Sequence, residues 1–170
     1  SVEMENITRK LINTRMRLLP YLYDTFARYH MEGIPPFRPL LMDFPMDAKT
    51  LNLSDQYMMG DNLLVAPLLD DTGKRKVYFP AGAWYNFNTN ERYEGGREYE
   101  VAIALDEMPL FVKDGTILPL ADPLQFVSET SVFNITCHVY GNPDGKQCTL
   151  FEDDGVSYDF ENKKIGRAHV

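Results

Sequence analysis

The spacing of apolar residues changes near residue 60, and this change limits the fold more than any other feature of the sequence. Before it, apolar side chains recur every three or four residues, which is typical of a helix with one buried face. After it, short apolar runs alternate with Gly, Pro, Asn and Asp, which is typical of strands joined by turns. We therefore expect a mainly β chain that opens with helical structure.

The helical pattern covers residues 7–29, with Asn6 as the candidate N-cap and Gly33 as the stop signal. Pro20 lies inside the pattern, where a proline costs about 3 kcal/mol and bends the helix axis. We expect a kink, or two helices that abut near Leu19.

The apolar run over residues 37–42 follows this helix directly. A helix, a brief turn and an apolar strand form half of a βαβ unit, and such a strand needs parallel neighbours to satisfy its backbone. No segment before it in this chain can supply them. The sequence therefore predicts that the chain is a piece of a larger protein.

Strand and turn signals alternate from Leu63 onward and predict a β-sandwich over residues 62–121. Within it, Lys113-Asp114-Gly115 separates two apolar runs and predicts a hairpin. Asp122-Pro123 marks a boundary, beyond which three further runs and two turns predict the opening strands of a second β module over residues 122–164. The expected strands are residues 63–66, 76–79, 84–87, 97–101, 109–112, 116–120, 133–140, 147–151 and 157–160.

Composition excludes several classes of protein. The chain has 170 residues, of which 44% are hydrophobic and 25% charged, and these values are typical of globular proteins. With 17 basic and 25 acidic residues its net charge is −8, which argues against binding to nucleic acid. No apolar run approaches the roughly 20 residues that cross a bilayer, and no signal peptide is visible. The 2 cysteines are too few for a disulfide-dense scaffold or a four-cysteine zinc site.

Histidine and serine patterns give no catalytic or metal site. No two histidines lie at a metal-ligand spacing, and the serines lack a Gly-x-Ser-x-Gly motif or a convincing His/Asp arrangement. Structural or solvated roles are favoured for all of them, and no cofactor is expected. They are His30, His138, His169, Ser54, Ser128, Ser131 and Ser157.

Two acidic features invite a functional interpretation. Glu152-Asp153-Asp154 places three acids in one turn, as a calcium site would require, but the EF-hand spacing is absent and a solvated turn is favoured. Asp43 follows an expected strand at its carboxyl end, which is the end that faces the active site in α/β barrels. For Asp43, a cap or a salt bridge is favoured over catalysis.

Trp84, Tyr85 and Phe87 lie in one short segment. Aromatic faces stack on sugar rings, so these residues could form a carbohydrate-binding patch. In a strand, however, alternate side chains point toward a core, and core packing is favoured.

Cys137 and Cys148 lie on the two arms that flank the turn at residues 142–145. Directly opposed positions of a hairpin come within disulfide range. Two free thiols are slightly favoured, and a bridge stays as the alternative.

The last six residues, 165–170, match one reading frame of a widely used sequencing-adapter oligonucleotide. We hypothesise that they are an assembly artefact and exclude them from the expected fold. Codons for these six residues in genomic DNA would overturn the hypothesis.

Several motifs, in order along the chain, resemble glycoside hydrolase family 31. Two segments resemble the last helix and the last strand of that family's catalytic barrel, four resemble its proximal carboxyl-terminal sandwich, and one resembles the acidic turn of its distal domain. In that order they are Arg17–Tyr23, Gly33–Leu40, Asp55–Pro67, Tyr78–Tyr85, Glu94–Gly96, Met108–Pro119 and Phe151–Gly155.

The resemblance implies the end of a catalytic (β/α)8 barrel over residues 1–61, a β-sandwich over 62–121 and the start of a distal β domain over 122–164. It implies a piece of a retaining α-glycosidase that hydrolyses terminal α-linked glucose or xylose from oligosaccharides or glycosides with two carboxylates. In that family both are Asp residues on earlier barrel strands. No catalytic residue is therefore assigned to this chain, which is expected to be inactive alone.

The resemblance also implies the partners, which are a carbohydrate substrate and the remainder of the barrel, with no nucleic acid and no membrane. Arg38 would lie in the last barrel strand, near the interior or the rim. Because an unpaired buried charge is costly, we predict a carboxylate partner for Arg38 outside this chain.

Two alternatives to the enzyme stay open. One is a non-catalytic carbohydrate-binding module that stacks sugars on Trp84, Tyr85 and Phe87, and the other is a structural β-sandwich without a ligand. The sugar specificity, the oligomeric state and the localisation are left open.

Overall fold

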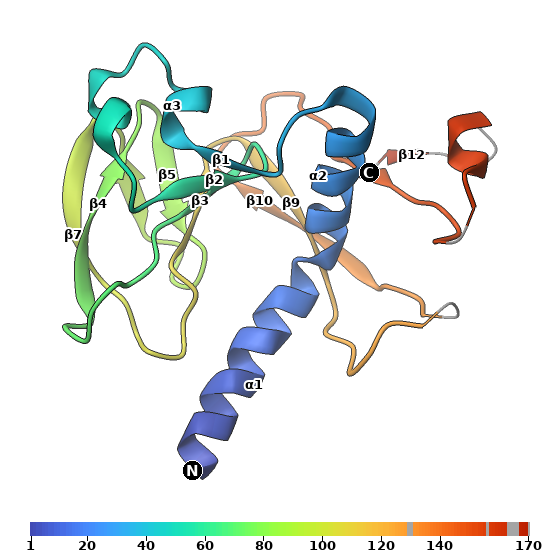
Figure 1. Cartoon of the computed structure of the whole chain (residues 1–170), viewed down its shortest axis with the longest axis horizontal. Coiled ribbons are helices and arrows are strands. Elements are labelled where there is room, and N and C mark those ends of the chain that lie inside the picture. Colours follow the sequence, from blue (N-terminus) through green and yellow to red (C-terminus); the bar gives the residue numbers. More distant parts are fainter. Residues whose placement is uncertain (129–130, 156, 163–166, 170) are drawn as a thin grey trace.

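A computed structural model describes residues 1–128, 131–155, 157–162 and 167–169. It runs from two long helices through short antiparallel strands, so the chain is mainly β, as predicted (Figure 1). In chain order the elements are α1 (Val2–Arg17), α2 (Leu19–Glu32), β1 (Phe37–Pro39), α3 (Leu40–Asp43), η1 (Ala48–Asn52), β2 (Tyr57–Met59), β3 (Leu63–Val65), β4 (Lys74–Phe79), β5 (Ala83–Asn86), β6 (Arg92–Glu94), β7 (Arg97–Ala102), β8 (Leu110–Lys113), β9 (Thr116–Ala121), β10 (Ile135–Tyr140), β11 (Thr149–Phe151), η2 (Asp159–Asn162) and β12 (Arg167–His169).

The helical region divides where its proline predicts. Helices α1 and α2 abut at Leu18, and Pro20 lies in the first turn of α2, where its missing N–H is not needed. Gly33 ends α2 in the left-handed conformation, with φ of 71°. The Asn6 cap is wrong: α1 begins earlier, and the Ser1 hydroxyl accepts the capping hydrogen bond. The Ser1 hydroxyl, five residues upstream, accepts from the otherwise free N–H of Met4, so the helix begins there.

Six strands form one antiparallel sheet in the order β1-β2-β3-β8-β5-β6. The strand expected over residues 37–42 is shorter, because α3 begins at Leu40. This strand, β1, pairs with β2, and the pairing is antiparallel. The expectation of parallel neighbours is therefore wrong for the edge of β1 that faces β2. Among the described residues, β1 is the outer strand of the sheet and its second edge carries no strand.

The six-stranded sheet is covered on both faces, which explains the uninterrupted apolar runs in β3 and β8. Leu64 and Phe111 point into one core, which the β4–β7 ladder covers. Their neighbours Leu63, Val65 and Val112 point into the other, which α2, β9 and β10 complete. The period of two along each strand thus serves two cores at once.

The hairpin predicted at Lys113-Asp114-Gly115 is wrong. Strand β8 pairs with β3 and β5, whereas β9 pairs with β10, so the turn passes the chain from one sheet to another. The N–H of Asp114 donates to the carbonyl of Ala83 (2.9 Å), and the N–H of Gly115 donates to the carbonyl of Tyr140 (2.8 Å). These bonds tie the turn to both sheets.

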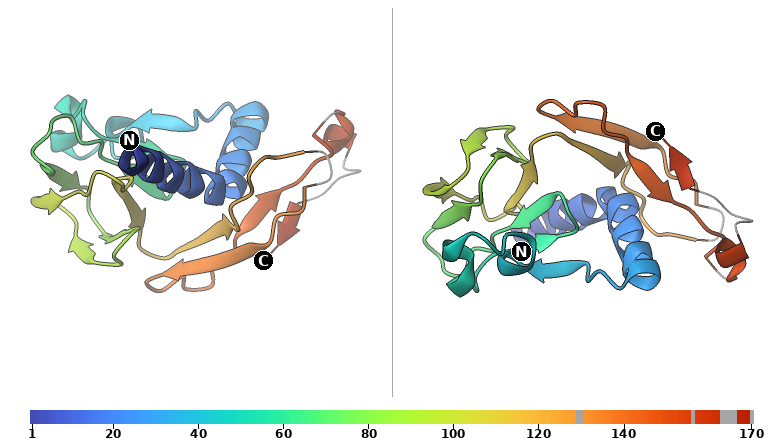
Figure 2. Two further views of the ribbon diagram at one scale, coloured as in Figure 1. Left: turned by 90° about the horizontal axis from the view of Figure 1, so that it is seen from below. Right: turned by 90° about the horizontal axis from the view of Figure 1, so that it is seen from above.

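Strands β11 and β12 lie beyond α2, seen from the six-stranded sheet (Figure 2). The strand expected over residues 157–160 is wrong, because the short helix η2 begins at Asp159. Helix α2 contacts β9 on one side and β11 on another. The β9–β10 ladder crosses the boundary predicted at residue 122, and the division into domains stays a prediction. Strand β12 pairs with β11, while residues 165, 166 and 170 of the suspect tail lie outside the described residues, so the artefact hypothesis also stays a prediction.

No helix within the described ranges has both the length and the apolar character needed to cross a membrane.

Candidate functional site

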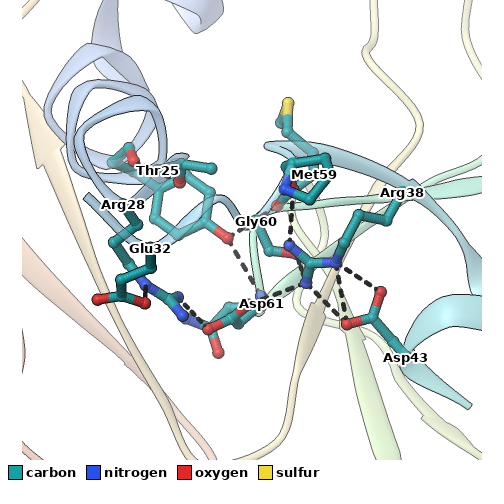
Figure 3. Close-up of polar contacts among 11 residues, drawn as sticks. Thr25, Arg28, Glu32, Arg38, Asp43, Met59, Gly60 and Asp61 are labelled. Carbon is teal, nitrogen blue, oxygen red and sulfur yellow. Dashed lines mark hydrogen bonds and ion pairs between the residues drawn. The ribbon is translucent and has the colours of Figure 1, made fainter. Parts of the chain in front are cut away.

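Charged side chains from three parts of the chain meet around Arg38, as Figure 3 shows. Arg38 comes from β1, Asp43 ends α3, Asp61 lies in the turn between β2 and β3, and Arg28 comes from α2. Arg38 is only 5% exposed. We call Arg28, Glu32, Arg38, Asp43 and Asp61 the arginine network.

Arg38 satisfies its guanidinium with two carboxylates and two backbone carbonyls. Its Nη2 and Nε donate to the two oxygens of Asp43 at 2.7 and 2.9 Å, a two-pronged geometry that strengthens a charged hydrogen bond. Nη2 also donates to Oδ1 of Asp61 at 2.9 Å and to the carbonyl of Gly60 at 3.1 Å, and Nη1 donates to the carbonyl of Pro35 at 2.9 Å. The hydrogen bond to Asp43 is the main cause that raises the pKa of Arg38.

Asp61 links the two arginines. Its Oδ2 pairs with Nη1 of Arg28, whose Nε lies 3.3 Å from Oε2 of Glu32. Partial burial by itself would raise the pKa of Asp61, but the hydrogen bonds and charges of Arg28 and Arg38 outweigh it and lower the pKa. The Asp61 carboxylate is therefore held in its charged form.

Tyr21 fixes the turn that carries Asp61. Its hydroxyl donates to the carbonyl of Met59 (2.8 Å) and accepts from the N–H of Asn62 (3.1 Å). Burial raises the pKa of this phenol. Gly60 lies between Met59 and Asn62 in the sequence and has a φ of 64°. A Cβ at this position would lie 2.2 Å from the Tyr21 hydroxyl oxygen. A glycine is thus required both for the turn and for the close approach of α2.

The geometry makes the arginine network a clamp. Each carboxylate in it accepts hydrogen bonds from a guanidinium, and the arginines bring two positive charges to three negative ones. The network ties the end of α3 and the turn after β2 to β1 and α2. The salt bridge favoured for Asp43 is confirmed, and the prediction that the partner of Arg38 lies outside this chain is wrong, because Asp43 and Asp61 supply it.

Trp84, Tyr85 and Phe87 do not form a sugar-stacking surface together. Trp84 is 0% exposed, and its Nε1 donates to the carbonyl of Pro80 at 2.9 Å. Tyr85 and Phe87 are half-buried against the second core. A sugar-stacking surface that includes Trp84 is therefore wrong, because the strand turns that side chain into the core.

The acidic turn is engaged in local bonds. Oδ1 of Asp153 accepts from the Tyr23 hydroxyl at 2.6 Å and from the N–H of Gly155 at 3.0 Å. Burial, followed by this bond to Asp153, raises the pKa of Tyr23 to about 12. The described part of the chain contains no group of three His, Cys, Asp or Glu side chains that could hold a metal ion.

The histidines do not come together. His30 lies in the last turn of α2, and its Nε2 lies 3.5 Å from Oε1 of Glu161 at the surface. His138 is half-buried in β10 opposite Leu118, and His169 belongs to β12.

The candidate serines serve in turns. The hydroxyl of Ser131 accepts from the N–H of Ser128 at 2.8 Å, and the N–H of Ser157 donates to Oδ1 of Asp154 at 2.8 Å. Ser54 is exposed after η1.

Both cysteines are free thiols, which is the favoured alternative. They are not opposed on one hairpin, because β10 pairs with β9 and β11 pairs with β12. Burial, followed by repulsion from an ionised Cys137 sulfur, raises the pKa of Cys148 to about 11.

Sequence reasoning missed Arg28 and Asp61. In the sequence both read as ordinary charged surface residues, and no periodic pattern indicates that they form ion pairs. The one usable signal is Gly60 directly before Asp61, since a glycine beside a charged residue in a turn often marks a close backbone approach.

Comparison with known proteins places these residues in a family. The family profile described as "Glycosyl hydrolase family 31 C-terminal domain" matches residues 33–118. The chain is similar to alpha-glucosidase 2 of Bacillus thermoamyloliquefaciens, with 35% identity over 168 residues that cover 98% of this chain and 21% of that protein. It is also similar to the alpha-xylosidase of Saccharolobus solfataricus, with 36% identity over 164 residues that cover 95% of this chain and 22% of that protein.

Among solved structures, the chain is similar to a mutant family 31 dextranase of Flavobacterium johnsoniae in complex with isomaltotriose. The TM-score is 0.90 at 35% identity, and the match covers 98% of this chain and 21% of the dextranase. The chain thus spans about a fifth of the length of the curated relatives it matches.

Proposed function

Because the chain belongs to glycosyl hydrolase family 31, we propose that it is the carboxyl-terminal part of a retaining α-glycosidase that releases terminal α-linked glucose or xylose from oligosaccharides or glycosides. The similarity along 98% of the chain to an α-glucosidase carries this proposal. The two catalytic carboxylates that such chemistry needs would lie outside this chain. In support, the carboxylates around Arg38 are tied to arginines rather than presented to a substrate.

We propose a structural role for this part of the enzyme. Residues 1–61 would complete the catalytic barrel, residues 62–121 would form a sandwich beside it, and residues 122–164 would begin a distal β domain. The open edge of β1 supports the first assignment, since its unpaired backbone groups would bond to a further strand.

Half-exposed aromatic side chains beside β1 give independent support. The rings of Phe26, Phe37 and Tyr57 form a row, with centroids 6.0 and 6.1 Å apart. Phe26 and Phe37 keep about half of their surface in water. A contiguous apolar patch of this kind is usually an interface, and a barrel packed on it would remove it from water.

The test compares the complete protein with the 170-residue chain, using aryl α-glucoside and aryl α-xyloside as substrates. We expect the complete protein to release glucose or xylose with retention of the anomeric configuration, and the chain alone to release neither. A complete protein that is inactive on both substrates would contradict the proposal. Oligosaccharide binding by the 170-residue chain alone would favour the binding-module alternative instead.

A further inference from the structure

A surface groove of about 390 Å³ lies between one face of α1 and the segment that follows β5. Its α1 wall includes the adjacent residues Arg9 and Lys10 and, about two turns further along, Arg17, and Phe87 lies opposite. The groove is open to solvent, and most of the residues that line it are exposed. We call it the α1 groove.

The α1 groove is positively charged, although the chain as a whole carries a charge of −8. Arg9 pairs with Glu5 and Lys10 pairs with Asp106, both at 2.7 Å, but these side chains are 66% and 52% exposed. Ion pairs at that exposure contribute little and can exchange for a ligand.

Arg17 is the cation best placed to hold an anion. Its guanidinium lies over the ring of Phe87, 5.9 Å from the centroid, and within the described residues it has no carboxylate partner. Contact with an aromatic face orients a guanidinium without neutralising it. A guanidinium held in this way can present two N–H groups to a carboxylate or phosphate.

Two neutral side chains complete the recognition surface. Asn6 and Asn13 line the same wall two turns apart, and in the part of the chain that the structure describes their amides make no hydrogen bond. An amide supplies both a donor and an acceptor, which is what a hydroxyl group needs.

We propose that the α1 groove binds a small anion that also carries hydroxyl groups, namely a sugar phosphate or a sugar carboxylate. The anionic group pairs with Arg17, and the hydroxyl groups bond to Asn6 and Asn13. This goes beyond the proposed hydrolase function, since cleavage of a neutral α-glycoside requires no anion.

The experiment is calorimetric titration of the complete protein with glucose 6-phosphate, glucuronate, glucose and inorganic phosphate. We expect one or both charged sugars to bind at least about tenfold more tightly than glucose and inorganic phosphate. Arg17→Gln removes that advantage, whereas any glucose bound elsewhere in the protein does not depend on Arg17. Glucose 6-phosphate and glucuronate distinguish phosphate from carboxylate as the anionic group.

Arg15→Gln is the matched control, because Arg15 lies on the same last turn of α1, is exposed and does not line the groove. We expect it to change the affinity less than about twofold. Equal affinity for glucose and both charged sugars, or equal losses in the two variants, would overturn the proposal. Inorganic phosphate that binds as tightly as glucose 6-phosphate would overturn recognition of the hydroxyl groups. Hydrolysis of a neutral glycoside stays unchanged in Arg17→Gln, so failure here is distinguishable from failure of the proposed function.

Discussion

The six-stranded sheet is stabilised in opposite ways at two places. Between the sheet and the β4–β7 ladder, the ring of Phe79 stacks on Tyr93 and meets Phe111 edge-on, both with centroids 4.9 Å apart, and Trp84 packs beside them. At the β1 end of the same sheet, the arginine network replaces aromatic packing with charge.

The difference teaches what each kind of contact tolerates. The aromatic cluster depends on volume and shape, and protons do not affect it over the ordinary pH range. The arginine network depends on every partner being present and charged, because a buried charge left alone is costly. Four predictions test this contrast.

The largest effect is expected from Trp84→Ala. It removes a 0% exposed side chain and the hydrogen bond from Nε1 to Pro80, so we expect the free energy of unfolding to fall by about 5 kcal/mol. Urea denaturation of the complete protein measures it. Phe126→Ala, at a 73% exposed aromatic, is the control, and similar losses in both variants would contradict burial of Trp84.

Arg38→Ala is expected to come next, at about 3 kcal/mol, because it leaves Asp43 without its partner. Arg92→Ala removes an exposed arginine that also pairs with a carboxylate, Glu94, and should cost less than about 1 kcal/mol. The same denaturation measurement compares them. Equal losses in the free energy of unfolding for Arg38→Ala and Arg92→Ala would show that the arginine network contributes no more than an exposed ion pair.

Gly60→Ala tests the close approach of Tyr21 to the turn. The left-handed φ and the clash with the Tyr21 oxygen should together cost about 2 kcal/mol. Gly33→Ala has a similar φ but open space around its Cβ, so it isolates the backbone contribution, about 1 kcal/mol. Equal melting temperatures for the two variants would show that the Tyr21 side chain moves away from the added Cβ without cost.

The smallest effect is a pH dependence. The pKa of Asp61 is lowered in the folded protein, so its stabilisation is present above the ordinary Asp pKa of about 3.9 and is lost as the pH falls through the lowered value. Asp61→Asn should therefore destabilise the protein at neutral pH and match it at low pH. The destabilisation caused by Trp84→Ala should stay constant over that range, and a pH-independent Asp61→Asn effect would mean that its charge is not involved.

Local signals predicted much of the fold. Pro20 and Gly33 placed the helix break and the helix end, because each changes the backbone itself. The apolar run at Leu63–Val65 indicated a strand buried on both sides, and the structure has one.

Pairing partners were harder to predict. The local sequence predicts a turn at Asp114-Gly115. It does not indicate whether the flanking strands pair with each other or with other strands, as they do here. The partners of Arg38 in the arginine network could not be predicted for the same reason. Arg38 was expected to need a carboxylate, but Asp61 reaches it only through tertiary packing of α2 on the turn at Gly60.

The strand order β3-β8-β5 also bears on how the protein is made. The ribosome releases β3 first, and its partner β8 follows only after residues 66–109 have emerged. Until then, one edge of an entirely apolar strand has no partner, although β2 pairs with its other edge and α2 covers one of its faces. Codon choices or chaperones that slow or protect the nascent chain over residues 66–109 should therefore affect yield more than those acting later.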